Sequence, residues 1–252
     1  MSAYNPAVDR ILARMGSHIP RFLPTEGVRQ PMLSANAWSA ITLETQADFN
    51  MAHIKAACAE SDLTALIAEL ADRAAIVLGH PGDTDSLAPL VETLGLTNAG
   101  NAPLMVYSLN GGVQDDDIER VTDAAGLDEL AGLMESAFSL TAEGPSLRTG
   151  LIEDPSVDGW LLRVDGVPRS GLITTRDDDL VGVYCMSTPA EFARRGYGRR
   201  VLNHVLGACA ATGAQYAYLV ATPAGFPLYR ATGFDTLAEL PIWVAGHSTQ
   251  FH

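Results

Sequence analysis

The sequence contains little cysteine and no cysteine or histidine spacing that is typical of a metal site. Its three cysteines, Cys58, Cys185 and Cys209, form no C-x-x-C pair, and each lies in an apolar run. They are too few for a disulfide framework, so we expect buried thiols in a reducing compartment. The six histidines show neither H-x-x-x-H nor H-E-x-x-H spacing. We therefore expect no dedicated metal site.

Positive charge is also scarce. The chain has 16 Lys+Arg against 30 Asp+Glu, a formal net charge of −14. Such a field repels nucleic-acid phosphates and anionic membrane surfaces, so we expect neither as a partner. No window approaches the roughly 20 apolar residues of a membrane helix. Residues 1–31 carry Asp9, Arg10 and Arg14, so we expect no signal peptide. These features favour a cytoplasmic protein.

The remaining composition is that of a globular protein with a substantial core. The chain has 252 residues, of which 47% are hydrophobic and 18% charged, which predicts one or two domains. The clearest linker is residues 111–117, where Gly111 and Gly112 favour a flexible joint and Asp115, Asp116 and Asp117 prefer water. We therefore predict two halves, residues 1–110 and 118–252, joined by that linker.

The two halves share a repeated pattern. Pro89-Leu90, Gly95-Leu96 and residues 103–106 (PLMV) resemble Pro227-Leu228, Gly233-Phe234 and residues 241–244 (PIWV), always 138 positions apart. This constant offset predicts a tandem duplication. In each copy we expect a short helix that ends at a left-handed glycine, then a strand, a turn, and a second strand that begins at the proline.

The second half has clear secondary-structure signals. We expect a strand at 118–121, a helix that begins after Asp123, strands at 160–164 and 171–175 joined by a turn at 165–168, a polar turn at 177–179, a central buried strand at 180–186, a helix at 199–212 and a strand at 216–220. The two expected helices bury Leu127, Leu130, Leu133, Met134 and Phe138, and Val201, Leu202, Val205, Leu206 and Cys209. Antiparallel strands followed by a strand–helix–strand crossover predict an α+β or mixed α/β fold and not a doubly wound sheet.

A basic, glycine-containing segment precedes the helix at 199–212. Residues 194–200 (RRGYGRR) hold four of the 16 Lys+Arg of an acidic protein, which points to an anionic ligand. Glycines let the backbone approach a ligand, and the first N–H groups of a helix can hold a pyrophosphate. The alternative is a solvated basic helix start. A dinucleotide fingerprint is disfavoured because its third glycine falls on Val201, and no Walker A sequence is present.

Two segments resemble a known family. Residues 186–198 (MSTPAEFARRGYG) resemble the acetyl-CoA-binding segment of the GCN5-related N-acetyltransferase (GNAT) family, whose pattern is Q/R-x-x-G-x-G/A. Gly196 and Gly198 match this pattern, and the leading Q/R position falls on Ala193. Residues 221–234 are similar to a later family segment that ends Leu-Tyr-x-x-x-Gly-Phe, here from Leu228 to Phe234. Together the two segments lie within residues 180–245.

The resemblance implies a GNAT-like mixed, mostly antiparallel twisted sheet flanked by helices, present here as two tandem related halves. It implies acetyl-CoA as co-substrate and no metal. The thioester would enter where strands 180–186 and 216–220 splay, and a neutral amine would attack it in a ternary complex. The residues implied for the cofactor are Met186, Ser187 and Thr188 on the pantetheine arm, Arg194, Arg195, Gly196, Tyr197, Gly198 and Arg199 at the pyrophosphate, and Thr222.

The resemblance also implies proton donors and leaves the base open. Tyr229 matches the family's general acid, because a phenol is protonated at neutral pH and can donate to the departing thiolate. The alternative for Tyr229 is an aromatic side chain on the core face of a short helix. Glu135 and Tyr184 are candidates for the general base, and a chain of waters, or no base at all, would serve as well.

The first half lacks the features of the second. The repeat offset places Val91 opposite Tyr229, and no glycine occurs between Gly27 and Gly79, before or within its presumed main helix at 62–71. We therefore interpret it as a degenerate copy that shapes the acceptor pocket. Trp38 and Phe49 either line that pocket or pack in the core. The acidic runs at 115–117 and 177–179 are interpreted as solvated turns rather than as sites that select a cationic acceptor.

The sequence thus predicts an acetyltransferase that moves an acetyl group from acetyl-CoA to a primary amine of a small molecule or amino acid. One alternative is an acyl-CoA-binding sensor without turnover, which the alanine at position 193 motivates. Another is an interaction protein that kept the fold and lost the cofactor. The acceptor, the acyl chain length and the oligomeric state, a homodimer included, stay open.

Overall fold

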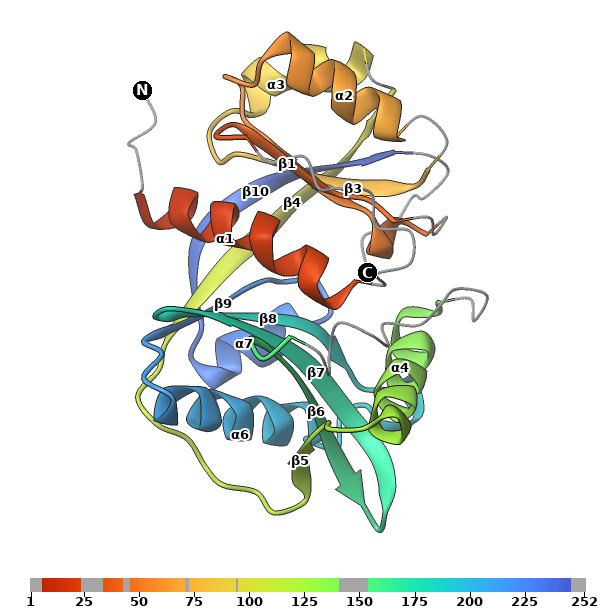
Figure 1. Cartoon of the computed structure of the whole chain (residues 1–252), viewed down its shortest axis with the longest axis vertical. Helices are drawn as coiled ribbons and strands as arrows, with labels where there is room; N and C mark the ends of the chain where they lie inside the picture. The colour runs from red at the N-terminus through yellow and green to blue at the C-terminus, as the bar shows by residue number, and fades with distance from the viewer. Residues whose placement is uncertain are drawn as a thin grey trace. The chain divides into compact units, whose positions relative to one another are not determined.

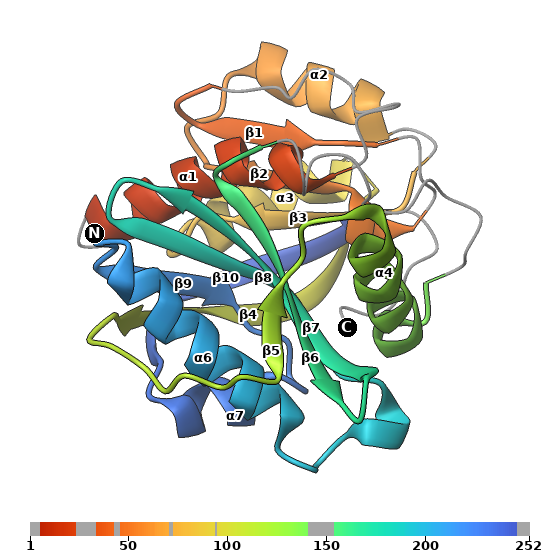
Figure 2. The same ribbon diagram turned by 60° about the horizontal axis from the view of Figure 1, so that its bottom comes forward.

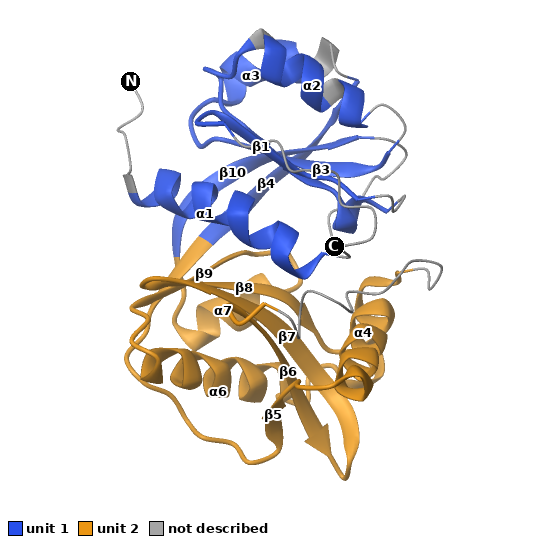
Figure 3. Cartoon of the chain, viewed as in Figure 1, with its two compact units in different colours: residues 1–104, 236–252 blue, residues 105–235 orange. Residues whose placement is uncertain are grey.

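The computed structural model describes residues 6–23, 34–42, 46–70, 73–93, 95–140 and 154–245. The chain divides into two compact units (Figure 3). Unit 1 comprises residues 1–104 and 236–252, and unit 2 comprises residues 105–235. Among the described residues, no helix has the length and hydrophobicity that crossing a membrane requires.

The described part of unit 1 combines mixed sheet strands with the helices α1, α2 and α3 and a 3₁₀ turn at Ala47–Phe49 (Figure 1). Its elements are α1 (Pro6–Phe22), β1 (Ala37–Ala40), β2 (Met51–Ile54), α2 (Glu60–Leu70), β3 (Ala75–Gly79), α3 (Thr84–Thr93), the first part of β4 (Thr97–Ser108) and most of β10 (Asp235–Ala245). The strand β1 is antiparallel to β2, β2 is parallel to β3, and β10 is antiparallel to β3. The helix α2 confirms the one expected at 62–71, whereas α1 had no counterpart in the sequence analysis.

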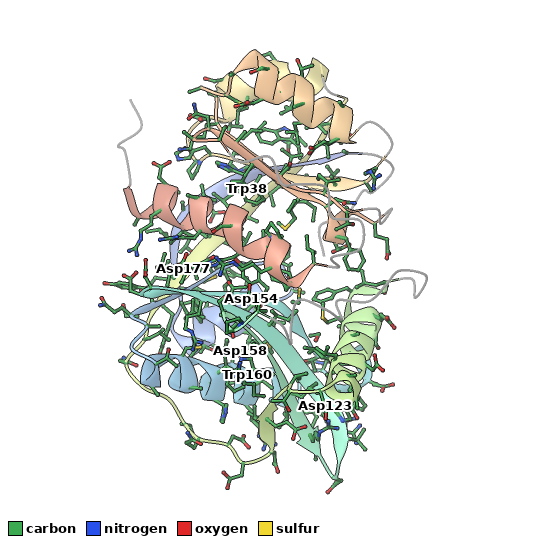
Figure 4. The ribbon with its side chains drawn as sticks, viewed as in Figure 1. Trp38, Asp123, Asp154, Asp158, Trp160 and Asp177 are labelled. Carbon is green, nitrogen blue, oxygen red and sulfur yellow. The ribbon has the colours of Figure 1, made fainter. Side chains whose placement is uncertain are left out.

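The helix α1 buries one apolar stripe. Val8, Ile11, Leu12, Met15 and Ile19, spaced by one, three or four residues, are each no more than 3% exposed. Trp38 packs on this helix at Gly16, where a Cβ would lie 2.6 Å from the Trp38 Cγ (Figure 4). Trp38 is 2% exposed. Of the two interpretations for this residue, the structure thus supports packing in the core.

Unit 2 also combines sheet strands with helices. Its elements are β5 (Ile118–Arg120), α4 (Ala124–Phe138), β6 (Val157–Val164), β7 (Val167–Asp177), β8 (Leu180–Ser187), α6 (Tyr197–Ala211), β9 (Tyr216–Val220) and α7 (Phe226–Thr232). The strands lie in the order β9-β8-β7-β6-β5, and every pair is antiparallel except β8 with β9. This confirms the mixed α+β fold, with a mostly antiparallel sheet and flanking helices, that the sequence predicts.

The helices α4 and α6 cover the two faces of this sheet (Figure 2). On one face the predicted stripe of α6, from Val201 to Cys209, packs in a cluster with Trp160, Leu162 and Leu172. On the other face α4 approaches closely because β6 and β7 present glycines. A Cβ at Gly159 or Gly171 would lie 2.9 or 2.6 Å from a Leu130 methyl carbon.

Local signals in the second half act as expected. Asp123 caps α4, since its carboxylate accepts the Gly126 N–H at 2.9 Å. The turn expected at 165–168 is tighter than predicted, because Asp165 and Gly166 both have positive φ (53° and 74°) and close a two-residue hairpin. This is the geometry that an Asp-Gly pair favours.

The repeated glycines have the same role in both copies. Gly95 and Gly233 have φ of +69° and +106°. After each, the next N–H reaches back to a carbonyl five residues earlier, Leu96 to Val91 and Phe234 to Tyr229, both at 3.0 Å. The left-handed helix ends that the sequence predicts are therefore confirmed. The duplication itself stays a prediction.

The prediction of a turn before each repeated proline is wrong. The strands β4 and β10 run without interruption through Pro103 and Pro241. The pairing of β10 with β3 begins at Ile242, so Pro241 withholds no N–H from that ladder. Both strands also change from exposed to buried at equivalent positions, Ala102 and Leu240.

The predicted linker is irregular, as expected, yet it is anchored within unit 2. A Cβ at Gly112 would lie 2.5 Å from the Gly207 Cα of α6. Asp115 and Asp117 form ion pairs with Arg200. The expectation of water-exposed carboxylates is wrong for Asp115, whose side chain is 19% exposed, and correct for Asp117, whose side chain is 57% exposed. The units also divide at residues 104/105 and 235/236, so the ranges 1–110 and 118–252 do not coincide with them.

Candidate active site

The parallel strands of unit 2 separate partway along their length. Their pairing joins Leu180 to Tyr216, Val181 to Ala217 and Gly182 to Tyr218, and within the described chain it extends no further. Both strands nevertheless continue, β8 to Ser187 and β9 to Val220. Beyond Gly182, the edge of β8 that faced β9 can offer its backbone N–H and C=O groups to an extended ligand. This is the splay that the sequence analysis expected.

A bulge in β8 sharpens this separation. The pairing with β7 shifts between Tyr184 and Ser187, which face Ile173 and Gly171, so β8 carries one extra residue there. Cys185, within the bulge, has a φ of 51°, a left-handed conformation that is uncommon for a non-glycine residue. The sequence predicts a strand buried on both faces. The structure instead leaves Tyr184, Cys185 and Met186 half-buried, because β9 no longer flanks them.

The basic segment places a helix N-terminus beside this opening. The N-cap of α6 is Gly196, with φ of 83°, and no side chain caps it. The N–H groups of Tyr197, Gly198 and Arg199 belong to the first turn, where an α-helix offers no backbone acceptor. The side chains of Arg194, Arg195 and Arg199 are exposed. The assignment of these residues to a pyrophosphate stays a prediction.

Arg200 differs from these three exposed arginines because its side chain is already paired. Its guanidinium donates to both carboxylate oxygens of Asp115, at 2.7 and 2.8 Å, and to Asp117 at 2.6 Å. The hydrogen bond from Arg200 holds the pKa of Asp115 below its usual value. The sequence analysis counted four arginines near the ligand, and the structure commits one of them to the linker.

Gly198 is the point at which the predicted segments meet. A Cβ there would lie 3.0 Å from the Met186 Cε, and 3.4 Å from both the Thr188 Oγ1 and the Leu228 Cδ2. The start of α6, the end of β8 and the helix α7 therefore adjoin one another at this glycine. A larger residue would push them apart.

Side chains fix the end of β8. Ser170 donates to the Ser187 carbonyl at 2.9 Å, and its hydroxyl lies 2.8 Å from that of Thr188. The Ser187 side chain is buried and donates to the Gly171 carbonyl at 3.3 Å. Of the residues predicted to pair with the pantetheine arm, Ser187 therefore has its hydroxyl turned into the protein, so any contact with a ligand is made by its backbone.

Tyr229 lies on α7 and is 8% exposed. Its ring packs edge-on against Phe234, with centroids 5.8 Å apart, and next to Gly225. Burial raises the pKa of the Tyr229 phenol, and the nearby Cys185 thiol raises it further. The phenol therefore stays protonated and faces the bulge of β8. This geometry is compatible both with proton donation and with a role in the core.

The two base candidates lie on the opposite side of the sheet. The Tyr184 hydroxyl is 2.8 Å from that of Tyr218. Glu135 is half-buried on α4, the helix that packs on β7 and β8.

Thr222 has a local role in addition to the predicted one. Its hydroxyl accepts the Gly225 N–H at 3.2 Å, and its carbonyl accepts the Phe226 N–H at 2.9 Å, so it organises the turn before α7. A contact with the cofactor would use the donor hydrogen or the second lone pair of the Thr222 hydroxyl.

Sequence reasoning missed several residues at this site. The Arg169 guanidinium lies 4.2 Å from the centroid of the Phe192 ring, which steadies the 3₁₀ turn Ala190–Phe192. Ser170 and Tyr218 were also missed. The one available signal was Gly182, since a glycine within a strand often marks a close approach.

The cysteines are all present as thiols. Cys209 is buried, and burial raises its pKa to about 12. Cys58 and Cys185 are only half-buried, so the expectation of three buried thiols is correct for Cys209 alone.

Similar solved structures are known. One is a GCN5-related N-acetyltransferase from Kribbella flavida, with a TM-score of 0.64 and 18% identity over 94% of this chain and 96% of that one. Another, described as an acetyltransferase of the GNAT family, comes from Novosphingobium aromaticivorans, with a TM-score of 0.56 and 18% identity over 87% and 92%. A third, of unknown function, comes from Staphylococcus epidermidis, with a TM-score of 0.60 and 13% identity over 86% and 94%. No protein-family model and no curated protein matches the sequence.

Proposed function

We propose that this chain, which has the GNAT fold, transfers an acetyl group from acetyl-CoA to a primary amine of a small molecule or amino acid. The observation that carries the proposal is the separation of β8 from β9 beyond the Gly182–Tyr218 pair, directly beside the glycine N-cap of α6. A strand edge and a helix N-terminus suit the two ends of the cofactor, the pantetheine amides and the pyrophosphate.

The cofactor would lie along the end of β8. Backbone groups of Met186, Ser187 and Thr188 would pair with the pantetheine arm. The segment from Arg194 to Arg199 would hold the pyrophosphate through N–H groups and guanidinium groups. Thr222 adjoins α7. This arrangement leaves Arg200 to hold the helix itself, because Asp115 and Asp117 already occupy its guanidinium.

Tyr229 would supply the proton for the leaving group. The amine nitrogen bonds to the thioester carbonyl carbon, the C–S bond breaks, and the departing thiolate takes the proton of the Tyr229 hydroxyl. The proton that the acetylated nitrogen loses goes to water, and the Tyr229 phenolate takes a proton back from water. The raised pKa of Tyr229 keeps that proton in place before the reaction. A cytoplasmic location and a metal-independent reaction belong to the same proposal.

Unit 1 would act as a structural partner without a cofactor. Its parallel pair β2 and β3 stays joined from Met51–Ile76 to Ile54–Gly79, the last residues of both strands. The Ala56 N–H, 138 positions before Arg194, donates to the Asp83 carboxylate at 2.8 Å. In unit 1 this backbone N–H is therefore already bonded to a carboxylate.

A second candidate is a sensor that binds an acyl-CoA without turnover. The burial of Tyr229 within the hydrophobic cluster of unit 2 favours it, as does the alanine at position 193.

The decisive experiment measures thiol release from acetyl-CoA with a panel of primary amines, alongside calorimetry with CoA. Amine-dependent thiol release supports the transferase. Tight binding with no turnover on any amine supports the sensor. An absence of binding heat at millimolar CoA would reject both.

A further inference from the structure

Three hydroxyl groups meet on the face of the unit 2 sheet that α4 covers. In the strand register, Thr175 faces Gly182 and Gly182 faces Tyr218. Side chains two residues apart on a strand share a face, so Tyr184 joins the same row. The Tyr184 and Tyr218 hydroxyl oxygens are 2.8 Å apart, and their rings are nearly perpendicular, at 88°. Thr175 is a further hydrogen-bond partner of Tyr218. We call Thr175, Tyr184 and Tyr218 the hydroxyl cluster.

The glycine at position 182 makes room for this cluster. A Cβ there would lie 2.4 Å from the Tyr184 Cε2, 2.7 Å from its hydroxyl oxygen and 2.8 Å from the Thr175 Oγ1. Any other residue would displace the Tyr184 ring from its position over the strand. A glycine in this central strand is therefore what allows the Tyr184 hydroxyl to lie next to Thr175 and Tyr218.

Burial differs sharply between the members. Tyr218 and Thr175 are 0% exposed, whereas Tyr184 is half-buried. A buried phenol needs a hydrogen-bond partner, and phenylalanine would fill the same apolar space without one. Burial also raises the pKa of Tyr218 well above its usual value, so this hydroxyl is neutral. Tyr218 is thus a fixed, uncharged anchor for the more accessible Tyr184.

Tyr184 stands where the active site opens. It follows the last β8–β9 pair by two residues and precedes Cys185 of the bulge. A hydroxyl oxygen at this position can accept an N–H from an uncharged amine, which leaves the amine lone pair available for attack.

We propose that the Tyr184 hydroxyl binds and orients the attacking amine nitrogen, and that Tyr218 is the positioning residue that holds this hydroxyl. The inference rests on the proposed acetyltransferase function and deepens it. It assigns Tyr184 the role of a neutral hydrogen-bond acceptor instead of a general base. The acceptor class is a primary amine in its uncharged form.

The test uses the full chain, acetyl-CoA and the best amine of the panel. Tyr184→Phe is expected to lower kcat/KM for the amine about tenfold, the factor that one hydrogen bond supplies. Tyr218→Phe is expected to lower it about threefold or more, because the retained Tyr184 loses its anchor. The dissociation constant of acetyl-CoA stays unchanged in both. Tyr216→Phe, an exposed phenol two residues along the same strand and face, is the matched control and stays at the wild-type value.

The double variant separates positioning from mere packing. If Tyr218 acts through Tyr184, adding Tyr218→Phe to Tyr184→Phe costs nothing further in kcat/KM. Fully additive losses would overturn the inference, as would unchanged kinetics in both single variants. Thermal unfolding reports whether each variant folds. If Tyr218→Phe does not, Thr175→Val removes the next hydroxyl and is expected to give the same non-additive pattern.

The pH profile distinguishes the orienting role from a base. A phenolate base at position 184 would make kcat rise with pH until the phenol ionises, and Tyr184→Phe would abolish that rise. That result overturns the inference while the transferase proposal survives. A wild-type protein that binds acetyl-CoA and acetylates no amine overturns the transferase proposal, and the inference fails with it.

Discussion

The environment decides what each tyrosine of unit 2 can do. Tyr216 is 43% exposed on the surface of β9. Tyr218, two residues later, is fully buried and bonded to a second phenol. Tyr229 is buried beside the Cys185 thiol, which together with burial raises its pKa. One residue type thus supplies an exposed surface phenol, a buried phenol bonded to another phenol, and a buried phenol that stays protonated.

The role of Tyr229 gives a first prediction at the residue scale. Tyr229→Phe keeps the ring that packs on Phe234 and removes only the hydroxyl, so we expect the fold and the affinity for acetyl-CoA to be retained. Because a positioned proton donor contributes about 10²–10⁴-fold, kcat should fall by about 10²-fold. Steady-state kinetics and CoA calorimetry check this. An unchanged kcat would remove Tyr229 from the mechanism.

His53 in unit 1 gives a prediction about pH. It is 2% exposed, stacks on Trp38 and meets His80 edge-on. Its pKa is lowered from 6.5 to about 3, mainly by burial, with smaller effects of His80 and Lys55 in the same direction and of Asp9 in the opposite direction. The unfolded chain therefore binds a proton that the folded chain does not, below the unfolded pKa. The contribution of His53 to the free energy of unfolding is fully present above the unfolded pKa. It is lost as the pH falls from that value towards the folded pKa, by up to about 1.4 kcal/mol per pH unit.

Urea unfolding between about pH 4 and neutrality measures this slope. His53→Gln should flatten it, because the titrating group is gone. A variant with the slope of the wild type would show that other groups, such as the Asp9 carboxylate, cause the acid sensitivity.

At the scale of elements, α6 begins at a glycine and is then held by contacts with the linker. Gly196 starts it with a left-handed residue, Arg200 ties its first turn to the linker, and Gly207 lies against the backbone of Gly112. His204 adds a further tie, since its Nδ1 accepts the Asp115 N–H at 3.0 Å. The helix that presents its N-terminus to the candidate cofactor site is therefore fixed along its length by the segment between β4 and β5.

Replacing a glycine with alanine is predicted to change the unfolding free energy in opposite directions at Gly207 and at Gly132. Gly207→Ala would place a Cβ 2.7 Å from the Gly112 Cα, so we expect a loss of about 1–3 kcal/mol in unfolding free energy. Gly132→Ala on α4 meets nothing within 4 Å, so the better helix former should add up to about 1 kcal/mol. Denaturant unfolding of both variants checks the signs. Equal effects would mean that the linker moves away at little cost.

At the scale of the whole molecule, the chain runs twice through a strand, a helix, a parallel strand, a helix and a further strand, first as β2-α2-β3-α3-β4 and again as β8-α6-β9-α7-β10. In unit 2 the parallel strands part after Gly182 and Tyr218, while in unit 1 they stay paired to their ends. In unit 1 the helix that follows the first of these strands has Asp62 in its first turn, and the negative charge of this residue disfavours a phosphate at the helix N-terminus.

This difference predicts a single cofactor site per chain. Calorimetry should give one acetyl-CoA bound per protein. Gly196→Val, which strains a residue with φ of 83°, should abolish that one binding event. Two binding events in the wild type, or one that survives Gly196→Val, would contradict the assignment of the site to unit 2.

Much of the local structure could be predicted because its causes lie within a few residues. Asp123 caps its own helix, Asp165-Gly166 closes its own hairpin, and Gly95 and Gly233 end their own helices. The stripe of α6 followed from helical spacing. The basic glycine segment and its position at a helix start followed from the same local reasoning.

The sequence by itself thus determined the helix ends, the hairpins, the mixed fold class and the location of the candidate anion-binding loop. Only the tertiary structure decided that Arg200 pairs with the linker, that β4 and β10 pass uninterrupted through their prolines, that Cys185 lies in a bulge, and that Tyr218 anchors Tyr184. The physical reason is range. A cap or a turn depends on neighbours a few positions away, whereas these contacts join residues up to 85 positions apart, whose distance is set by the packing of the whole chain.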